Sequence, residues 1–190
     1  MKMNLPNKLT LLRIALIPVF VVLLSFPNMW CQLAAALVFI GASVTDFLDG
    51  NIARKHNLVT NFGKFADPIA DKMLVMSAYI VLVAQKRMPA WVCIIFLARE
   101  FTISGFRLVA AGSGKVISAA MLGKIKTVTQ MIASVMLVLL LPCQGHEAIF
   151  GFMGTFGEVM ANIMMYVALV MTVWSGADYI YKNRQFIKDM

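Results

Sequence analysis

The chain has 190 residues, of which 61% are hydrophobic and only 14% are charged, and its mean hydropathy is +0.81. A soluble domain of this size is much less apolar, so the composition excludes one and predicts a polytopic membrane protein with a single domain, residues 1–190. The net charge of +8 does not indicate a nucleic-acid partner, because the basic residues lie in short segments between apolar runs and no nucleic-acid motif is present.

The apolar runs predict an all-α fold with six transmembrane helices. The first ends near residue 26, the second begins near residue 30, and the others cover about 63–84, 90–110, 119–140 and 159–181. Of the 17 lysines and arginines, only Lys86 and Arg87 fall on the side opposite the termini. This bias predicts that both termini are cytoplasmic. Residues 141–155, which include His146 and Glu147, are expected to form an outer loop that can hold an interfacial segment.

The chain between residues 45 and 72 carries four aspartates in an otherwise apolar sequence. Together with small residues and one arginine they form the pattern Asp46-x2-Asp49-Gly50-x2-Ala53-Arg54-x8-Gly63-x3-Asp67-x3-Asp71. On a helix, residues three, four and seven apart share a face, so each half of the pattern presents a stripe of acids and small residues. If the two halves form neighbouring antiparallel helices, the four carboxylates can converge on one small volume.

Four carboxylates at close range repel one another, and they stay ionised together only with cations between them. Oxygen ligands favour Mg²⁺, Mn²⁺ or Ca²⁺ over zinc, and two such ions about 3.5–4 Å apart are a common device for displacement at phosphorus. Gly50, Ala53 and Gly63 leave room for a ligand to approach the backbone, and Arg54 suits a phosphate oxygen. The alternative is that the aspartates are structural acids at helix ends, and Asp67, which precedes a proline, has the form of an N-cap.

Polar residues also lie within the predicted fourth and fifth helices. Glu100, Ser104 and Arg107 share one face of the fourth helix, and a charged face inside a membrane is expected to point to the bundle interior or to a water-filled cavity. Arg107 is the better binding candidate, because it lies nearer the cytoplasmic end; the alternative is that it pairs with Glu100 and only aids packing. Lys124 and Lys126 serve either as snorkelling anchors or, with Arg107, as cations for a small anionic substrate.

Position for position, the pattern of residues 46–71 resembles the signature of the CDP-alcohol phosphotransferase family, D-x2-D-G-x2-A-R-x8-G-x3-D-x3-D. The resemblance implies that two Mg²⁺ or Mn²⁺ ions are held by Asp46, Asp49, Asp67 and Asp71. It implies that Asp71 is also the catalytic base, which takes the proton from the attacking hydroxyl. It further implies a CDP-lipid site formed by Asp46, Asp49, Gly50, Ala53, Arg54 and Gly63.

Two further patterns resemble the phosphatidylglycerophosphate synthase branch of that family. They are Asn7-x2-Thr10-x2-Arg13 near the start of the chain and Lys124-x-Lys126-Thr127-x2-Gln130 in the fifth predicted helix. In this branch the second pattern implies a pocket for the phosphate of the acceptor. Arg107, Lys124 and Lys126 are therefore expected to bind that phosphate.

The resemblance predicts an enzyme of phospholipid biosynthesis in the bacterial inner membrane, with its active site at the cytoplasmic face. It would transfer the phosphatidyl group of CDP-diacylglycerol to the 1-hydroxyl of sn-glycerol 3-phosphate, release CMP, and act as a homodimer among membrane lipids. Within the family, a phosphatidylinositol-phosphate, phosphatidylserine or cardiolipin synthase is the alternative. Outside it, a cation or proton transporter would use the four aspartates as relay sites, although all four lie toward one face of the membrane.

Overall fold

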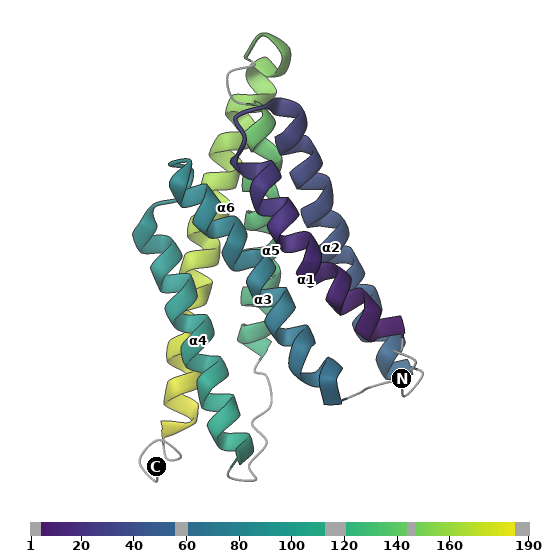
Figure 1. Ribbon diagram of the computed structural model, residues 1–190. Coiled ribbons are helices and arrows are strands. Elements are labelled where there is room, and N and C mark those ends of the chain that lie inside the picture. Colours follow the sequence, from purple (N-terminus) through teal and green to yellow (C-terminus); the bar gives the residue numbers. More distant parts are fainter. Residues whose placement is uncertain (1–4, 56–60, 113–120, 144–146, 185–190) are drawn as a thin grey trace.

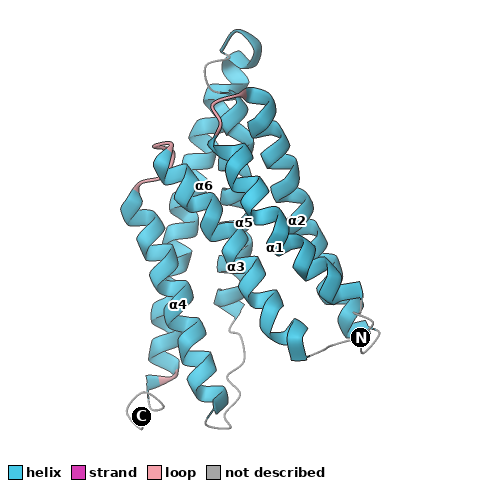
Figure 2. Cartoon of the chain, viewed as in Figure 1, coloured by secondary structure: helices cyan, strands magenta, loops and turns pink. Residues whose placement is uncertain are grey.

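The computed structural model describes residues 5–55, 61–112, 121–143 and 147–184. These residues form helices and connecting turns and contain no strand (Figure 2), which confirms the all-α fold for the described part of the chain. The helices are α1 (Leu5–Ser25), α2 (Met29–Lys55), α3 (Asn61–Ala84), α4 (Ala90–Gly112), α5 (Met121–Leu140), the short 3-10 helix η1 (Leu141–Cys143) and α6 (Glu147–Lys182).

The six α-helices run alternately up and down, so that α1, α3 and α5 begin at the lower end of the bundle in Figure 1 and α2, α4 and α6 end there. α1 packs along α2 and α3, α5 packs along α6, and α4 joins α6 to α3. Aromatic rings lie at two of these contacts. The ring centres of Phe20 and Phe39 are 5.4 Å apart between α1 and α2, and those of Tyr79 and Phe96 are 5.3 Å apart between α3 and α4. The second contact holds α3 and α4 side by side around the candidate site.

The helices have the length and composition of a membrane protein. Among the described residues, Lys8–Ser25, Met121–Leu140 and Gly154–Lys182 are long and apolar enough to cross a bilayer, and Met29–Thr45 and Lys72–Ala84 are shorter apolar stretches. Large apolar side chains such as Trp30 and Leu108 are 72% and 76% exposed on the outside of the bundle. A lipid environment removes the cost of this exposure.

Local hydrogen bonds explain where two of the helices begin and end. Asn28 caps α2, because its side-chain oxygen accepts a hydrogen bond of 2.9 Å from the Trp30 backbone N–H. At the end of α3, Lys86 has a φ of 59°, and the N–H groups of Lys86 and Arg87 donate to the carbonyls of Val83 and Leu82. This is the Schellman arrangement that closes a helix. Both turns lie where the sequence predicted them.

At the end of the bundle where α3 ends and α4 begins, side chains from distant parts of the chain contact one another. Arg87, in the turn between α3 and α4, forms an ion pair with Glu158 of α6. Trp91 of α4 lies 6.5 Å from Tyr166 of α6, and Gln85 donates a hydrogen bond of 2.6 Å to the Leu24 carbonyl at the end of α1. These contacts lie at the opposite end from the start of α1.

The segment 141–155, predicted as an outer loop that can hold an interfacial segment, is helical in most of its described residues. Residues 141–143 form η1, and Glu147 is already the first residue of α6. Gly151 has a φ of 38° and a ψ of −127°, which breaks α6 near its start, and glycine suits such a conformation because it lacks a Cβ atom. His146 lies outside the described residues. The alternative that Asp67 is an N-cap is wrong, because α3 begins at Asn61 and residues 67 and 68 lie inside it.

Candidate active site

A cavity of about 660 Å³ lies between α3, α4, α5 and α6. Its volume is in the range of small-molecule sites, about 300–1,000 Å³. Among the described side chains, five cations and one carboxylate line it: Lys72, Arg99, Glu100, Arg107, Lys124 and Lys126. Apolar side chains complete the wall, among them Val75, Phe96 and Leu97. Excess positive charge in a partly apolar cavity suits a small ligand that carries a phosphate or carboxylate.

Two neighbouring residues of α4 connect this helix to the other walls of the cavity. Arg99 Nη2 donates a hydrogen bond of 3.2 Å to Ser175 Oγ of α6, and Glu100 forms an ion pair with Lys126 of α5. Arg99 Nη1 also lies 3.4 Å from Glu100 Oε1, so one carboxylate contacts two cations. The Nε of Arg99 is buried and has no hydrogen-bond partner within the described residues. Such a donor favours a ligand or water at that point of the wall.

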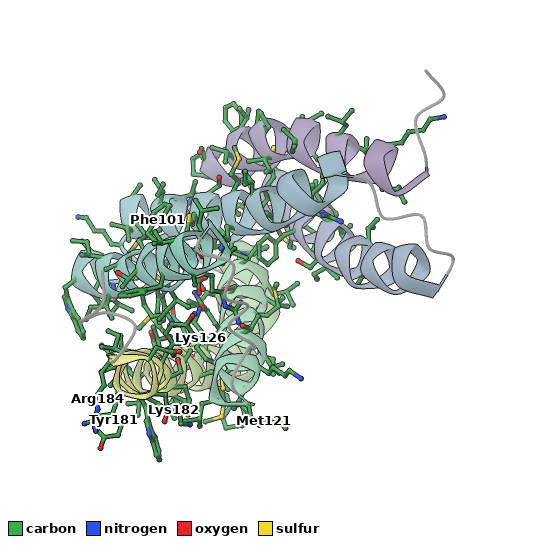
Figure 3. All side chains as sticks on the ribbon, turned by 90° about the horizontal axis from the view of Figure 1, so that it is seen from below. Phe101, Met121, Lys126, Tyr181, Lys182 and Arg184 are labelled. Carbon is green, nitrogen blue, oxygen red and sulfur yellow. The ribbon has the colours of Figure 1, made fainter. Side chains whose placement is uncertain are left out.

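Lys126 is almost fully buried, with 1% of its surface exposed. Figure 3 shows its side chain pointing into the space between α4, α5 and α6, whereas Tyr181 and Arg184 point away from the bundle. A buried ammonium group needs a counter-charge, which Glu100 supplies. The alternative that Lys126 is a snorkelling anchor is therefore wrong. Lys124 lies on the exposed side of α5, because residues two apart do not share a helix face.

Arg107 is exposed and lies at the cavity wall, toward the end of α4. The alternative that it pairs with Glu100 is wrong, since the carboxylate is taken by Lys126 and Arg99 instead. The structure thus brings all three predicted acceptor-binding residues, Arg107, Lys124 and Lys126, to one cavity.

Neutral polar groups line the cavity farther along α3 and α5. The Tyr79 hydroxyl lies 2.9 Å from Ser134 Oγ, which itself donates a hydrogen bond of 2.7 Å to the Gln130 carbonyl. Ser134 has only one proton, so the Tyr79 hydroxyl is the donor in the first bond and keeps its acceptor capacity. Tyr79 and Gln130 both contribute to the cavity wall. This part of the cavity can hydrogen-bond an uncharged hydroxyl group.

The backbone places the aspartate pattern on two helices that contact each other and run antiparallel (Figure 1). Asp46, Asp49, Gly50, Ala53 and Arg54 lie in α2, and Gly63, Asp67 and Asp71 lie in α3. The side chains of these residues are outside the described part of the structure, so the convergence of the four carboxylates stays a prediction. Among the side chains that are described, no group of three or more His, Cys, Asp or Glu is arranged to hold a metal.

The register of α3 relates the predicted base to the cavity. Residues 71, 75 and 79 are four apart and share one helix face. Val75 and Tyr79 line the cavity, and Asp71 is one turn closer to the start of the helix. By its register, position 71 therefore lies on the same face of α3 as Val75 and Tyr79, which line the cavity.

Sequence patterns missed several residues of the cavity wall. Lys72 donates a hydrogen bond to Ser104 across from α3 to α4, and it directly follows Asp71. Arg99, Tyr79 and Ser175 were also not predicted as site residues. A charged residue in the apolar fourth helix was a signal for Arg99, whereas nothing in the sequence relates Ser175 to Arg99, 76 positions away.

The bundle and its cation-rich cavity define a helical membrane protein with a site suited to an anionic ligand. Residues 3–174 match the family model of the CDP-alcohol phosphatidyltransferases. The chain belongs to this family, as the pattern of residues 46–71 predicted, and it is therefore a transferase.

Full-length relatives share the chain's length and much of its sequence. The chain is 46% identical over 197 residues to the CDP-diacylglycerol–glycerol-3-phosphate 3-phosphatidyltransferase of Bacillus subtilis, and 97% of each chain is covered. The enzymes of the same name from Rickettsia typhi and Shigella flexneri are 40% and 39% identical. The alignment covers 93% of this chain and 94% of the Rickettsia protein, and all of both chains for the Shigella protein.

Proposed function

We propose that the protein transfers the phosphatidyl group of CDP-diacylglycerol to sn-glycerol 3-phosphate and releases CMP. The observation that carries this proposal is the similarity over the full chain to relatives that are named for this reaction. The cavity supports it independently, because the five cations on its described wall suit an acceptor that carries a phosphate.

The acceptor is held by the cavity. Arg107, Lys124 and Lys126 bind its phosphate, and Arg99 adds a buried N–H donor at the same wall. Binding at one end orients the rest of the molecule, so the acceptor hydroxyl is directed along α3 toward Asp71. The apolar side chains around it exclude water that would otherwise compete as a nucleophile.

The CDP-lipid is proposed to lie over α2 and the start of α3, against Asp46, Asp49, Gly50, Ala53, Arg54 and Gly63. Asp46, Asp49, Asp67 and Asp71 fit divalent ions by the chemistry of their donors, since carboxylate oxygens are the ligands that Mg²⁺ and Mn²⁺ prefer. When bound, two such ions would neutralise charge on the diphosphate and on the departing CMP.

Asp71 accepts the proton of the acceptor hydroxyl as its oxygen bonds to the β-phosphorus of CDP-diacylglycerol. The bond between that phosphorus and the bridging oxygen breaks, and this oxygen leaves as part of CMP. The products are phosphatidylglycerophosphate, CMP and a proton on Asp71, which passes to solvent.

The cellular setting follows from the same proposal. Six membrane-crossing helices with both termini in the cytoplasm would place the aspartate pattern and the cavity at the cytoplasmic face of the bacterial inner membrane. The water-soluble acceptor enters from that side, and the acyl chains leave between helices into the bilayer. The enzyme is expected to act as a homodimer.

An acceptor panel tests the proposal. Purified protein in detergent receives CDP-diacylglycerol and Mg²⁺ or Mn²⁺, and CMP release is measured with glycerol 3-phosphate, serine, inositol phosphate or phosphatidylglycerol. We expect release with glycerol 3-phosphate alone. Release only with another acceptor would keep the aspartate chemistry and overturn the acceptor assignment. No release with any acceptor from folded protein would overturn the transferase function.

A further inference from the structure

Glu100 is unusual in its surroundings. Among the described residues that line the cavity it is the one carboxylate, and it lies beside five cations. A negative charge in a site for an anionic ligand repels that ligand, and the repulsion is stronger in a partly apolar cavity than in water. The carboxylate must therefore contribute something that offsets this repulsion.

Its contacts show what that contribution is. Glu100 holds the ammonium group of Lys126 in an ion pair and lies 3.4 Å from Arg99 Nη1. Ser175 fixes the other terminal nitrogen of Arg99 from α6. Through these contacts one carboxylate of α4 sets the positions of one cation on α5 and one on α4 itself.

Two glycines show how closely Arg99 is confined. A Cβ atom on Gly176 would lie 3.4 Å from Arg99 Cγ, and a Cβ atom on Gly123 would lie 3.7 Å from its Nη2. The stem of Arg99 therefore passes along α6, and its guanidinium group ends beside α5. Arg99 therefore lies between these two helices and Glu100, and its buried Nε has no hydrogen-bond partner in the described structure.

Long cationic side chains gain most from such support. Lysine and arginine have many rotamers, and a ligand that must order them loses about 0.5–1.5 kcal/mol of affinity for each one. A side chain that is already ordered avoids this loss. Lys126 and Arg99 are ordered by Glu100, whereas Arg107 and Lys124 are exposed.

We propose that Glu100 is a positioning residue for the acceptor's phosphate: it fixes Lys126 and Arg99 so that both meet the phosphate in a preformed arrangement. This inference rests on the proposed function. Glu100 does not touch the phosphate itself. Its negative charge lowers the total attraction of the cavity for anions. In return, it holds the donor groups of Lys126 and Arg99 in fixed directions toward the phosphate.

The test compares Glu100→Gln and Glu100→Asp with the unmodified protein in the CMP-release assay, with each substrate varied in turn. We expect Glu100→Gln to raise the KM for glycerol 3-phosphate about 10-fold to 100-fold, because two cations lose their common anchor. The KM for CDP-diacylglycerol should stay within about twofold, and kcat should fall less than the acceptor KM rises. Glu100→Asp keeps the charge and should restore part of the acceptor affinity.

Glu158→Gln is the matched control. Glu158 also pairs with an arginine, Arg87, but at the end of the bundle where α3 ends and away from the cavity. This variant should leave both KM values unchanged. Equal changes in Glu100→Gln and Glu158→Gln would instead indicate a general effect of removing an ion pair.

The outcomes separate the inference from the proposed function. If the unmodified protein releases no CMP with glycerol 3-phosphate, the proposed function fails. If it does, and Glu100→Gln leaves the KM for glycerol 3-phosphate within twofold or raises both KM values equally, the positioning role is refuted. If Glu100→Gln does not fold, Glu100→Asp decides alone: an acceptor KM within twofold of the unmodified value overturns the proposal, and a selective rise of about threefold or more supports it.

Discussion

Replacing Lys126 by methionine removes one charge from the cavity and keeps a side chain of similar length. Lys126 is 1% exposed and pairs with Glu100, and breaking a buried ion pair by removing one partner commonly costs about 3–5 kcal/mol. Here the carboxylate keeps a second cation, Arg99 Nη1 at 3.4 Å. We therefore expect a smaller loss of stability, about 1–3 kcal/mol. For a chain of this length that corresponds to a melting temperature lowered by about 2–4 °C per kcal/mol.

The effect of Lys126→Met on activity is expected to exceed its effect on stability. Lys126 is proposed to donate a charge-assisted hydrogen bond to the acceptor phosphate, and such a bond contributes about 1.5–3 kcal/mol. Its loss lowers kcat/KM for glycerol 3-phosphate by about 10-fold to 150-fold, since 1.4 kcal/mol corresponds to a factor of ten. The KM for CDP-diacylglycerol should not change. The assay is CMP release at 25 °C, with folded protein quantified in the same detergent.

Lys182→Met provides the comparison. Lys182 also forms an ion pair, with Asp178 at 2.8 Å, but 61% of its side chain is exposed. A pair of this kind contributes about 0.2–1 kcal/mol, so neither melting temperature nor activity should change appreciably. If Lys126→Met keeps kcat/KM for glycerol 3-phosphate within twofold of the unmodified protein, the assignment of the cavity as the acceptor site is wrong.

The other predictions concern the aspartates, the metals and one turn. Asp71→Asn should still bind CDP-diacylglycerol but lose turnover by about 10²-fold to 10⁴-fold, and near-normal turnover would show that Asp71 is not the essential base. EDTA should abolish CMP release, and added Mg²⁺ or Mn²⁺ should restore it; activity that persists in EDTA would contradict the two-ion site. Lys86→Gly should stabilise the protein by about 0.5–1 kcal/mol, because Lys86 has a φ of 59° that glycine adopts without strain. A lower melting temperature for this variant would contradict that account.

The helices could be predicted from the sequence because each contains a long apolar run. Turns at 26–28 and 85–89 were placed correctly, since Asn, Pro and charged residues mark them. The segment 147–155 was not, because the glycines at 151, 154 and 157 resemble a loop composition. Contacts between residues far apart in the chain, such as those of α6 with α5 and η1, are not visible as a local pattern.

The sequence likewise predicted some residues of the candidate site and missed others. Arg107 and the two lysines of α5 were predicted from short patterns of spacing, and the structure brings them to the cavity. The site of the four aspartates, predicted in the same way, stays a prediction. The pairing of Glu100 with Lys126 was not, since 26 residues separate them and either could have pointed to lipid. Tyr79 and Ser134 were missed for the same reason, with 55 residues between two hydroxyl groups that meet in the structure.

One helix, α3, belongs to both halves of the proposed active site. It carries the last two aspartates of the pattern, and from Lys72 to Tyr79 it lines the acceptor cavity. A single residue inserted between Asp71 and Val75 would rotate everything after it by about 100° and advance it by about 1.5 Å, so the base and the cavity would no longer face the same way. The number of residues between Asp71 and Val75 therefore determines whether the two halves of the proposed site face each other. The other cavity walls, α4 to α6, can change side chain by side chain, so a lineage can acquire a new acceptor while its aspartate chemistry stays the same.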